Sequence, residues 1–377
     1  MAAPQTFALT PTLTISRILT GLWQVADMEK DGAALDLNEA ADHLGAYVED
    51  GFTTFDMADH YGSAELIAGT LLARHQGPGR PLAFTKWCPK PGPMTKEVVR
   101  QGVEERCQRL GVSTVDLLQF HWWTFEHPAW LDALHELAEL KREGMIGEIG
   151  VTNFDTAHLA LALAEGIPIV SNQVPFSLID RRASGDMSAL CKEKGVKLLA
   201  YGTLCGGFLS ERWLGKAAPD TIADWSRMKY RRFIDAAGGW DGFQAVLSAA
   251  HHVAQKHGVS IANVATRWVL EHEAVAGVIV GIRPGENQHR ADNLKLFSFT
   301  LDQDDEAVLN AAFAKTDPIP GDCGDEYRKP PFLTASGDLR HHLDALPPVY
   351  APQPHQERPS RSTVASGSIW EDIAGFS

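Results

Sequence analysis

Eight short runs of branched and aromatic residues alternate with longer helical patterns along this chain, and this alternation constrains the fold more than any other feature. Runs of this kind, bounded by turn residues, are typical of buried strands. Regular alternation of strands and helices predicts a parallel sheet with helical crossovers. Because eight such units can close into a barrel, we expect an α/β fold of the (β/α)8 TIM-barrel type in a single domain. A doubly wound open sheet is the alternative.

The expected strands and helices follow one another with short loops over most of the chain. We place the strands at residues 17–23, 52–55, 82–86, 115–121, 146–151, 168–172, 196–200 and 275–281. We place the helices at residues 36–49, 63–74, 95–110, 128–143, 156–165, 184–194, 241–256, 261–271, 282–297 and 302–315. No G-x-G-x-x-G pattern follows any of these strands, so the fingerprint of a dinucleotide site on an open sheet is missing.

Three segments depart from the alternation. Residues 7–15 alternate weakly and predict an N-terminal hairpin at one end of the barrel. Residues 202–240 predict a long loop after the seventh strand, which either covers a cofactor or is simply solvated. Beyond the last helix the periodicity fades, so we expect a barrel domain over residues 1–316 and a C-terminal extension over 317–377, rich in proline and serine, that packs on the barrel.

The acidic composition narrows the classes of partner. The chain has 34 Lys and Arg against 48 Asp and Glu, a formal net charge of −14. We therefore expect no nucleic-acid partner, and no membrane partner, because no apolar run is long enough to cross a bilayer. Five scattered cysteines without a C-x-x-C pair, and the absence of a secretory pattern in residues 1–10, favour the cytoplasm.

Titratable side chains stand at the ends of three neighbouring strands. Asp56 follows the second strand, and Tyr61 comes five residues later in the loop that leads to the next helix. Lys86 ends the third strand and His121 ends the fourth. The carboxyl ends of the strands of a barrel meet at one mouth, where the chemistry of such enzymes takes place. We therefore expect these four side chains to lie together.

This combination of groups suits protonation of a carbonyl oxygen. Tyrosine, with a reference pKa of about 10, is a poor acid at neutral pH, and a neighbouring lysine ammonium lowers that pKa. An aspartate keeps the lysine charged and oriented, and a neutral histidine can hydrogen-bond the same carbonyl oxygen. No protein side chain supplies hydride, and a nicotinamide cofactor is the usual source, so we expect one here.

Six motifs at the strand ends resemble, in order, those of the aldo-keto reductase superfamily. They are FDMADHYG at 55–62, FTK at 84–86, LQFH at 118–121, GVTNF at 150–154, SNQ at 171–173 and YGTL at 201–204. The resemblance covers roughly residues 13–315 and implies a barrel that binds NADPH extended across its C-terminal face. It implies that Tyr61 is the general acid and base, that Lys86 and Asp56 tune it, and that His121 orients the carbonyl group.

The resemblance also implies a set of binding residues. Thr152, Asn153 and Gln173 would hold the carboxamide, and Tyr201 would stack on the nicotinamide. The remaining cofactor residues would be Gly202, Leu204, Gly206, Gly281, Arg283, His289, Asp292 and Asn293, with Arg283 or Arg290 gripping a 2′-phosphate. Trp23, Trp87 and Trp122, with Trp123 as the alternative to Trp122, would contact the substrate.

We therefore expect an oxidoreductase that interconverts an aldehyde or ketone and the corresponding alcohol, by hydride transfer at nicotinamide C4 with Tyr61 as general acid and base. NADP(H) is favoured and NAD(H) is possible, no metal is expected, and the protein is a monomer or a homo-oligomer. A nucleotide-sensing regulatory subunit with little catalysis is the alternative. A metal-dependent barrel enzyme is a weaker rival, because the sequence contains no clustered set of His, Asp and Glu ligands.

Overall fold

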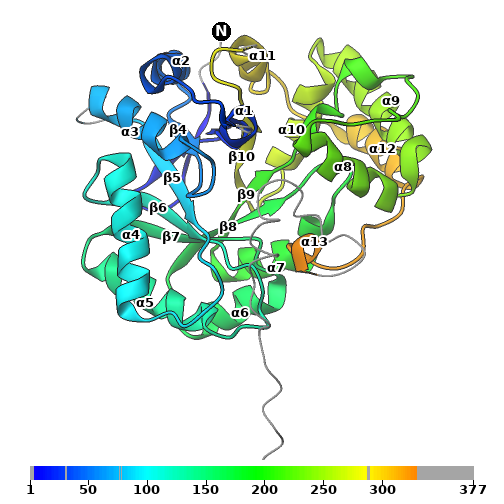
Figure 1. The fold of residues 1–377 in the computed structure, drawn as a ribbon. Helices are drawn as coiled ribbons and strands as arrows, with labels where there is room; N and C mark the ends of the chain where they lie inside the picture. Colours follow the sequence, from blue (N-terminus) through cyan, green and yellow to red (C-terminus); the bar gives the residue numbers. More distant parts are fainter. Residues whose placement is uncertain (1–3, 30–31, 76, 78, 287–288, 329–377) are drawn as a thin grey trace, which may run out of the picture.

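Eight parallel strands close into a barrel in the computed structural model, which describes residues 4–29, 32–75, 77, 79–286 and 289–328 (Figure 1). The strands are β3 (Ile18–Gly21), β4 (Thr54–Asp56), β5 (Leu82–Trp87), β6 (Val115–Phe120), β7 (Ile146–Thr152), β8 (Ile169–Pro175), β9 (Lys197–Tyr201) and β10 (Val275–Gly281). Each pairs with the next along the chain, and β10 pairs with β3 to close the ring. The predicted (β/α)8 barrel is confirmed, and the open sheet is excluded.

Helices surround the barrel in the order that the sequence predicts. They are α2 (Leu37–Glu49), α3 (Ala64–Arg74), α4 (Lys96–Leu110), α5 (Trp130–Arg142), α6 (Thr156–Ala164), α7 (Asp186–Lys194), α9 (Gly239–His257), α10 (Ile261–Leu270), α11 (Arg290–Lys295) and α12 (Gln303–Phe313). Several begin at side chains that accept a backbone N–H, as Asp36 does for α2 and Thr95 for α4. A short helix, α1 (Gln24–Met28), follows β3 and was not predicted.

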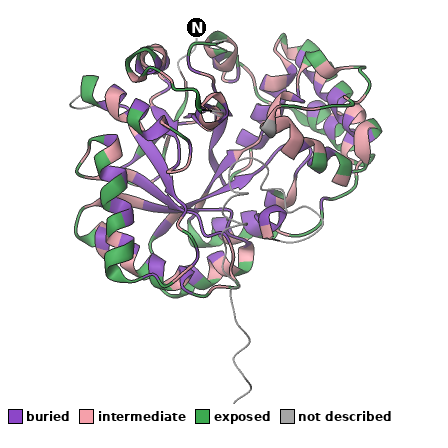
Figure 2. Ribbon diagram, viewed as in Figure 1, coloured by how far each residue is buried: buried purple, intermediate pink, exposed green. Residues whose placement is uncertain are grey.

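The N-terminal hairpin closes one end of the barrel. Its strands are β1 (Thr6–Ala8) and β2 (Thr14–Ser16), which pair antiparallel. Leu13 and Ile15 belong to the same buried cluster as barrel residues such as Leu19 and Leu117. Figure 2 shows the barrel strands buried and the outward faces of the helices exposed. Across the part of the chain that the structure describes, none of the helices combines the length and apolar content that a membrane span requires.

The segment after β9 is more ordered than the predicted loop. Two short 3-10 turns, η3 (Cys205–Gly207) and η4 (Glu211–Trp213), lead to the helix α8 (Trp225–Ala236). Asp224 begins α8 by accepting the N–H of Arg227 at 2.9 Å. Tyr230, Phe233 and Ile234 then follow helical spacing and lie buried in one apolar cluster. These three residues therefore form a helix face that packs inward, which corrects the prediction of a loop throughout residues 202–240.

Part of the predicted C-terminal extension lies against the barrel. Asp322 accepts the N–H of Thr156 through Oδ2 at 2.7 Å, and its carbonyl accepts from Arg182 at 2.8 Å. A single helical turn, α13 (Asp325–Arg328), follows, and Arg182 pairs with Glu326 at 3.0 Å. The rest of the extension, residues 329–377, lies outside the described residues.

Candidate active site

A buried ion pair stands at the carboxyl ends of two neighbouring strands. Lys86 Nζ donates to Asp56 Oδ2 at 2.7 Å and to the carbonyl of Met57 at 3.0 Å. Lys86 is 2 % exposed and Asp56 is 3 % exposed. The carboxylate and the carbonyl oxygen offset the desolvation of the buried ammonium group.

Two amide side chains complete the surroundings of Asp56. Gln119 and Gln173 donate from Nε2 to Asp56 Oδ1 at 2.9 and 2.7 Å. Gln173 Nε2 also lies 2.7 Å from Gln119 Oε1. Sequence reasoning missed Gln119, although it stands two residues before His121 and therefore on the same side of its strand. In the structure, the side chain of Gln173 contacts Asp56 of the ion pair, and its backbone pairs with Thr152 and Asn153, which are predicted to hold the carboxamide.

Tyr61 is the predicted proton donor, and it lies against this ion pair. Lys86 Nζ is 4.8 Å from the centre of the Tyr61 ring, within cation–π range. The ring is also in edge contact with His60, whose Nδ1 is 2.6 Å from Asp59. The local sequence FDMADHYG therefore brings Asp56 and Tyr61 to one lysine, as the strand–loop–helix pattern predicted.

His121 is buried at the end of β6. Neither ring nitrogen has a hydrogen-bond partner among the described residues. Burial lowers the pKa of His121 well below its usual value, and nearby positive groups, His60, Arg328 and Lys86, lower it further. The side chain is therefore a neutral imidazole at physiological pH, with a donor available for a carbonyl oxygen.

The tryptophans around the mouth divide between the core and the site. Trp122 is fully buried, and its indole N–H donates to the carbonyl of His127 at 3.1 Å. Trp87 packs against α4, where its ring leaves no room for a Cβ at Gly102. Trp123 instead lies 5.8 Å from His121, ring centre to ring centre. Side chains along extended chain alternate in direction, so the residue two after His121 faces the same side and its immediate neighbour faces away.

The structure thus places the ring of Trp123 against the ring of the predicted catalytic histidine, whereas Trp87 contacts His121 through its backbone carbonyl. Trp23 is only partly buried and packs at the edge of the main core.

The residues predicted to hold the nicotinamide cluster at the ends of β7, β8 and β9. Tyr201 Oη donates to Asn153 Oδ1 at 2.9 Å. Asn153 adopts a positive φ of 55°, a strained conformation for a side-chain-bearing residue. Thr152 is opposite Gln173 in the β7–β8 register. Burial raises the pKa of Tyr201 well above its usual value, as do the neighbouring Tyr327 and Glu326, so this phenol stays protonated.

The turn α13 brings side chains to the same mouth that sequence reasoning did not assign. The ring of Tyr327 lies 6.1 Å from that of His121 and 5.3 Å from that of Trp123. Its Oη is 3.2 Å from Tyr201 Oη and accepts a hydrogen bond from Lys229. Lys229 Nζ also lies 4.9 Å from the centre of the Tyr201 ring. No sequence motif identifies Tyr327 as a site residue, because its position at the mouth depends on the path of the chain after α12.

Two glycines predicted for the cofactor provide room for a protein side chain. Gly202 and Gly206 have positive φ values of 72° and 64°. A Cβ at Gly202 would lie 2.3 Å from Tyr230 Oη, and one at Gly206 would lie 3.0 Å from the same ring. Leu204, between them in sequence, lines a small cavity together with Asn293. The predicted cofactor residues after β9 and after β10 therefore meet in space.

The segment after β10, which is predicted to bind the adenosine end of the cofactor, contains side chains that form ion pairs with other parts of the protein. Arg283 pairs with Asp27 and lies 3.4 Å from Asp224. Asp292 accepts from Ser260 at 2.8 Å and from Asn263 at 3.2 Å, both through Oδ2. Gly281 ends β10 and is exposed, as is His289 immediately before α11.

Buried polar atoms without partners cluster where a cofactor and a substrate are expected. Among the described residues these include both ring nitrogens of His121, Thr152 Oγ1, Gln24 Oε1 and Trp123 Nε1. Such groups are costly unless a ligand or water satisfies them. Their positions, at the ends of β3, β6 and β7, fit a polar ligand that spans the mouth.

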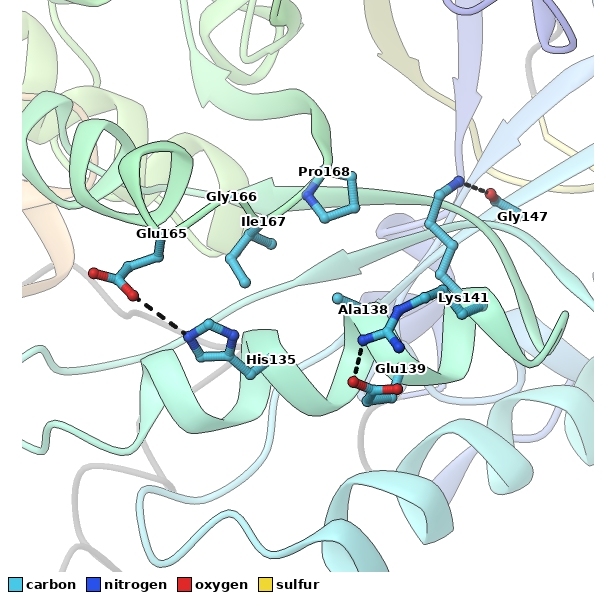
Figure 3. Close-up of a pocket in the computed structure, with 10 residues that line it drawn as sticks. His135, Ala138, Glu139, Lys141, Gly147, Glu165, Gly166, Ile167 and Pro168 are labelled. Atoms are coloured by element: carbon cyan, nitrogen blue, oxygen red, sulfur yellow. Dashed lines mark hydrogen bonds and ion pairs between the residues drawn. The ribbon is translucent and has the colours of Figure 1, made fainter.

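A surface pocket elsewhere on the molecule is separate from this cluster (Figure 3). It lies where α5 and α6 end and β7 and β8 begin, at the opposite end of the strands, and His135 and Glu165 face each other there at 3.8 Å. In these barrels that end serves stability rather than chemistry. Within the described ranges, no group of three or more His, Cys, Asp or Glu side chains is arranged to hold a metal ion.

Comparisons with known proteins agree with this geometry. The sequence profile of the Aldo/keto reductase family matches residues 17–313. Among curated proteins, Flagellar radial spoke protein 5 of Chlamydomonas reinhardtii is 32 % identical over 42 % of this chain, although the match spans only 33 % of that protein. Aldo-keto reductase YhdN of Bacillus subtilis is 26 % identical, over 84 % of this chain and 95 % of its own length. A solved glycerol dehydrogenase from Gluconobacter oxydans is 25 % identical with a TM-score of 0.69, covering 85 % of this chain and 98 % of its own.

Proposed function

The chain belongs to the aldo/keto reductase family. From this membership and its site, we propose that it is a nicotinamide-dependent oxidoreductase that interconverts an aldehyde or ketone and the corresponding alcohol. Tyr61 protonates the carbonyl oxygen in the reduction and deprotonates the alcohol in the reverse reaction. The observation that carries the proposal is the juxtaposition of Tyr61 with the buried Lys86–Asp56 pair, 4.8 Å from ring centre to ammonium. The small-molecule substrate is a carbonyl compound or the matching alcohol.

Each side chain of the site has a role in the reaction that follows from its charge and position. The Lys86 ammonium stabilises the phenolate of Tyr61, so that the phenol can give up its proton to a carbonyl oxygen and recover it afterwards. Asp56, fixed by two glutamine amides, keeps Lys86 in place. Neutral His121 donates one hydrogen bond to the same oxygen, which stabilises the charge that develops there. A bound nicotinamide supplies or accepts the hydride.

The residues at the ends of β7 to β9 suit the nicotinamide. The Thr152 hydroxyl, which has no partner among the described residues, and the amides of Asn153 and Gln173 would hold its carboxamide. The Tyr201 ring would support its face. Arg227, near the start of α8 beside Gly206, has a buried Nε without a partner among the described residues, and this cation suits the pyrophosphate. NADP(H) is the form that the sequence favours, with NAD(H) as the alternative.

A nucleotide-sensing regulatory subunit is the second candidate function. Its support is the position of α13, whose Tyr327 lies against both His121 and Tyr201 at the mouth. A redox-reporting barrel would bind the nucleotide at the same residues and turn over little. We also propose the cytoplasm as the compartment, since all five cysteines are free buried thiols.

The deciding experiment is the oxidation of NADH and of NADPH, followed by absorbance, with a panel of aldehydes and ketones that includes glyceraldehyde. The reverse reaction is run with glycerol and simple alcohols, because glycerol is the substrate named for a structural relative. Turnover with one cofactor supports the enzyme. Tight binding of a cofactor with no turnover in either direction would support the regulatory subunit, and failure to bind either cofactor would contradict both.

A further inference from the structure

The segment that follows β10 carries three basic side chains, and each is committed to a carboxylate of the protein. These are Arg283, Arg290 and Lys295, of which Lys295 lies 3.2 Å from Asp292. This is the segment where the sequence predicts the adenosine end of the cofactor. The pairing matters because NADP(H) differs from NAD(H) only by a phosphate on the adenosine ribose, in place of a 2′-hydroxyl group.

Arg283 joins three elements through acidic partners. Its Nη2 pairs with Asp27 of α1, which is only 5 % exposed, and lies 3.4 Å from Asp224, the residue that caps α8. Its Nε lies 3.9 Å from Glu286. The guanidinium is therefore surrounded by three carboxylates, and two of them are themselves held in place by the start of a helix or by burial.

Arg290 is committed in a similar way to the end of α2. Its Nη1 donates to Asp50 Oδ2 at 2.5 Å and to the carbonyl of Ala46 at 2.6 Å. The guanidinium also lies 5.7 Å from the centre of the Tyr47 ring. The Nη1 donors of Arg290 are therefore directed at the protein, and its positive charge faces a carboxylate.

The local charge balance follows from these pairs. Three cations face five carboxylates, those of Asp27, Asp224, Glu286, Asp50 and Asp292. A 2′-phosphate is doubly charged, so in this segment it would have to share each arginine with a carboxylate that repels it. A 2′-hydroxyl makes no such demand, and a carboxylate is the acceptor that suits a ribose hydroxyl.

We infer that this protein prefers NAD(H) to NADP(H), with Asp27 and Asp224 as the residues that determine the preference by holding Arg283. The inference rests on the proposed function, because it concerns the cofactor of that site. We assign Arg227 to the pyrophosphate, because its backbone lies beside Gly206. The pyrophosphate is common to both cofactors, so Arg227 is not part of the preference.

The test is the dissociation constant of NADH and of NADPH, measured by quenching of tryptophan fluorescence, which needs no turnover. The wild type should bind NADH more tightly by about tenfold or more, the scale of one charged hydrogen bond. Asp27→Asn should remove one of the three carboxylates around Arg283 and tighten NADPH binding several-fold while NADH binding stays the same. The matched control is Asp42→Asn, which breaks an exposed Arg–Asp pair with Arg74 between α2 and α3 and should change neither constant.

Two further variants keep the result unambiguous. Arg227→Met should weaken both cofactors by the same factor. Arg283→Ala should not weaken NADPH relative to NADH in the wild-type background. The inference would be overturned if the wild type bound NADPH more tightly than NADH and lost this preference in Arg283→Ala or in Arg227→Met. The proposed oxidoreductase would then still stand. Failure of the wild type to bind either cofactor would overturn the proposed function as well.

Discussion

Lys86 Nζ lies 2.7 Å from Asp56 Oδ2, and the two side chains project from neighbouring strands into one end of a closed barrel. Neither charge faces water, so each is stable only because the other is present. The pair therefore gives the lysine ammonium a fixed position next to Tyr61. A tyrosine beside such a charge can act as an acid, which is the property that the proposed chemistry requires.

Tyr61→Phe tests the proposed proton donor. The ring and its contact with Lys86 remain, but the hydroxyl is lost. We expect kcat to fall by about 10²- to 10⁴-fold, the usual contribution of a general acid, while the dissociation constant for the cofactor changes little. Steady-state kinetics and fluorescence titration measure the two effects. A variant that retains wild-type kcat would show that Tyr61 does not donate the proton.

Lys86→Met tests the cost of leaving Asp56 unpaired. Removal of one partner of a buried ion pair is expected to lower the free energy of unfolding by about 3–5 kcal/mol. Lys192→Met is the control, because Lys192 pairs with Glu273 in an exposed position and should cost less than about 1 kcal/mol. Urea denaturation followed by circular dichroism compares them. Equal losses in the two variants would contradict the buried pair.

His121 predicts a dependence of stability on pH. Its pKa is lowered in the folded state, so between that value and the unfolded value of about 6.5 the unfolded chain binds more protons. The stabilisation is fully present above about pH 6.5 and is lost as the pH falls below it, by at most about 1.4 kcal/mol per pH unit. The free energy of unfolding of His121→Gln, measured from pH 7.5 to 5.5, should fall less steeply than that of the wild type. Parallel curves would rule out this contribution.

Gly324→Ala tests the contact that holds α13 at the mouth. Gly324 has a positive φ of 84°, and a Cβ there would lie 2.2 Å from the carbonyl oxygen of Asn153. Gly166→Ala is the matched control: its φ is 78° and no atom lies within 4 Å of its Cβ. Both variants carry the left-handed penalty of about 1–2 kcal/mol. Only Gly324→Ala should lose more stability than this and also change KM, by displacing Tyr327.

The outcome for Gly324→Ala separates two roles of the C-terminal segment. If both variants lose the same stability and keep the wild-type KM, the segment does not depend on the contact with Asn153. An altered KM confined to Gly324→Ala would place α13 in the path of the cofactor or the substrate.

The amino-acid sequence determined the barrel and most of its mouth. Strand and helix periods are local properties, and a strand tip in a parallel barrel can point to only one end. The positions of Asp56, Lys86 and His121 at strand tips were therefore readable without coordinates. So was the family, since six short motifs occur in order, and the comparisons confirm it.

Tertiary structure decided what local patterns do not encode. The direction of Trp122 and Trp123 depends on where the extended chain ends. Part of the predicted loop after β9 is the helix α8, because its apolar residues pack into a second buried cluster. Two of the partners of Arg283, Asp27 and Asp224, come from positions more than fifty residues away in sequence. Tyr327 reaches His121 only because the chain returns across the mouth after α12. Contacts between distant segments depend on the packing of the whole chain, and therefore appear only when the barrel is assembled.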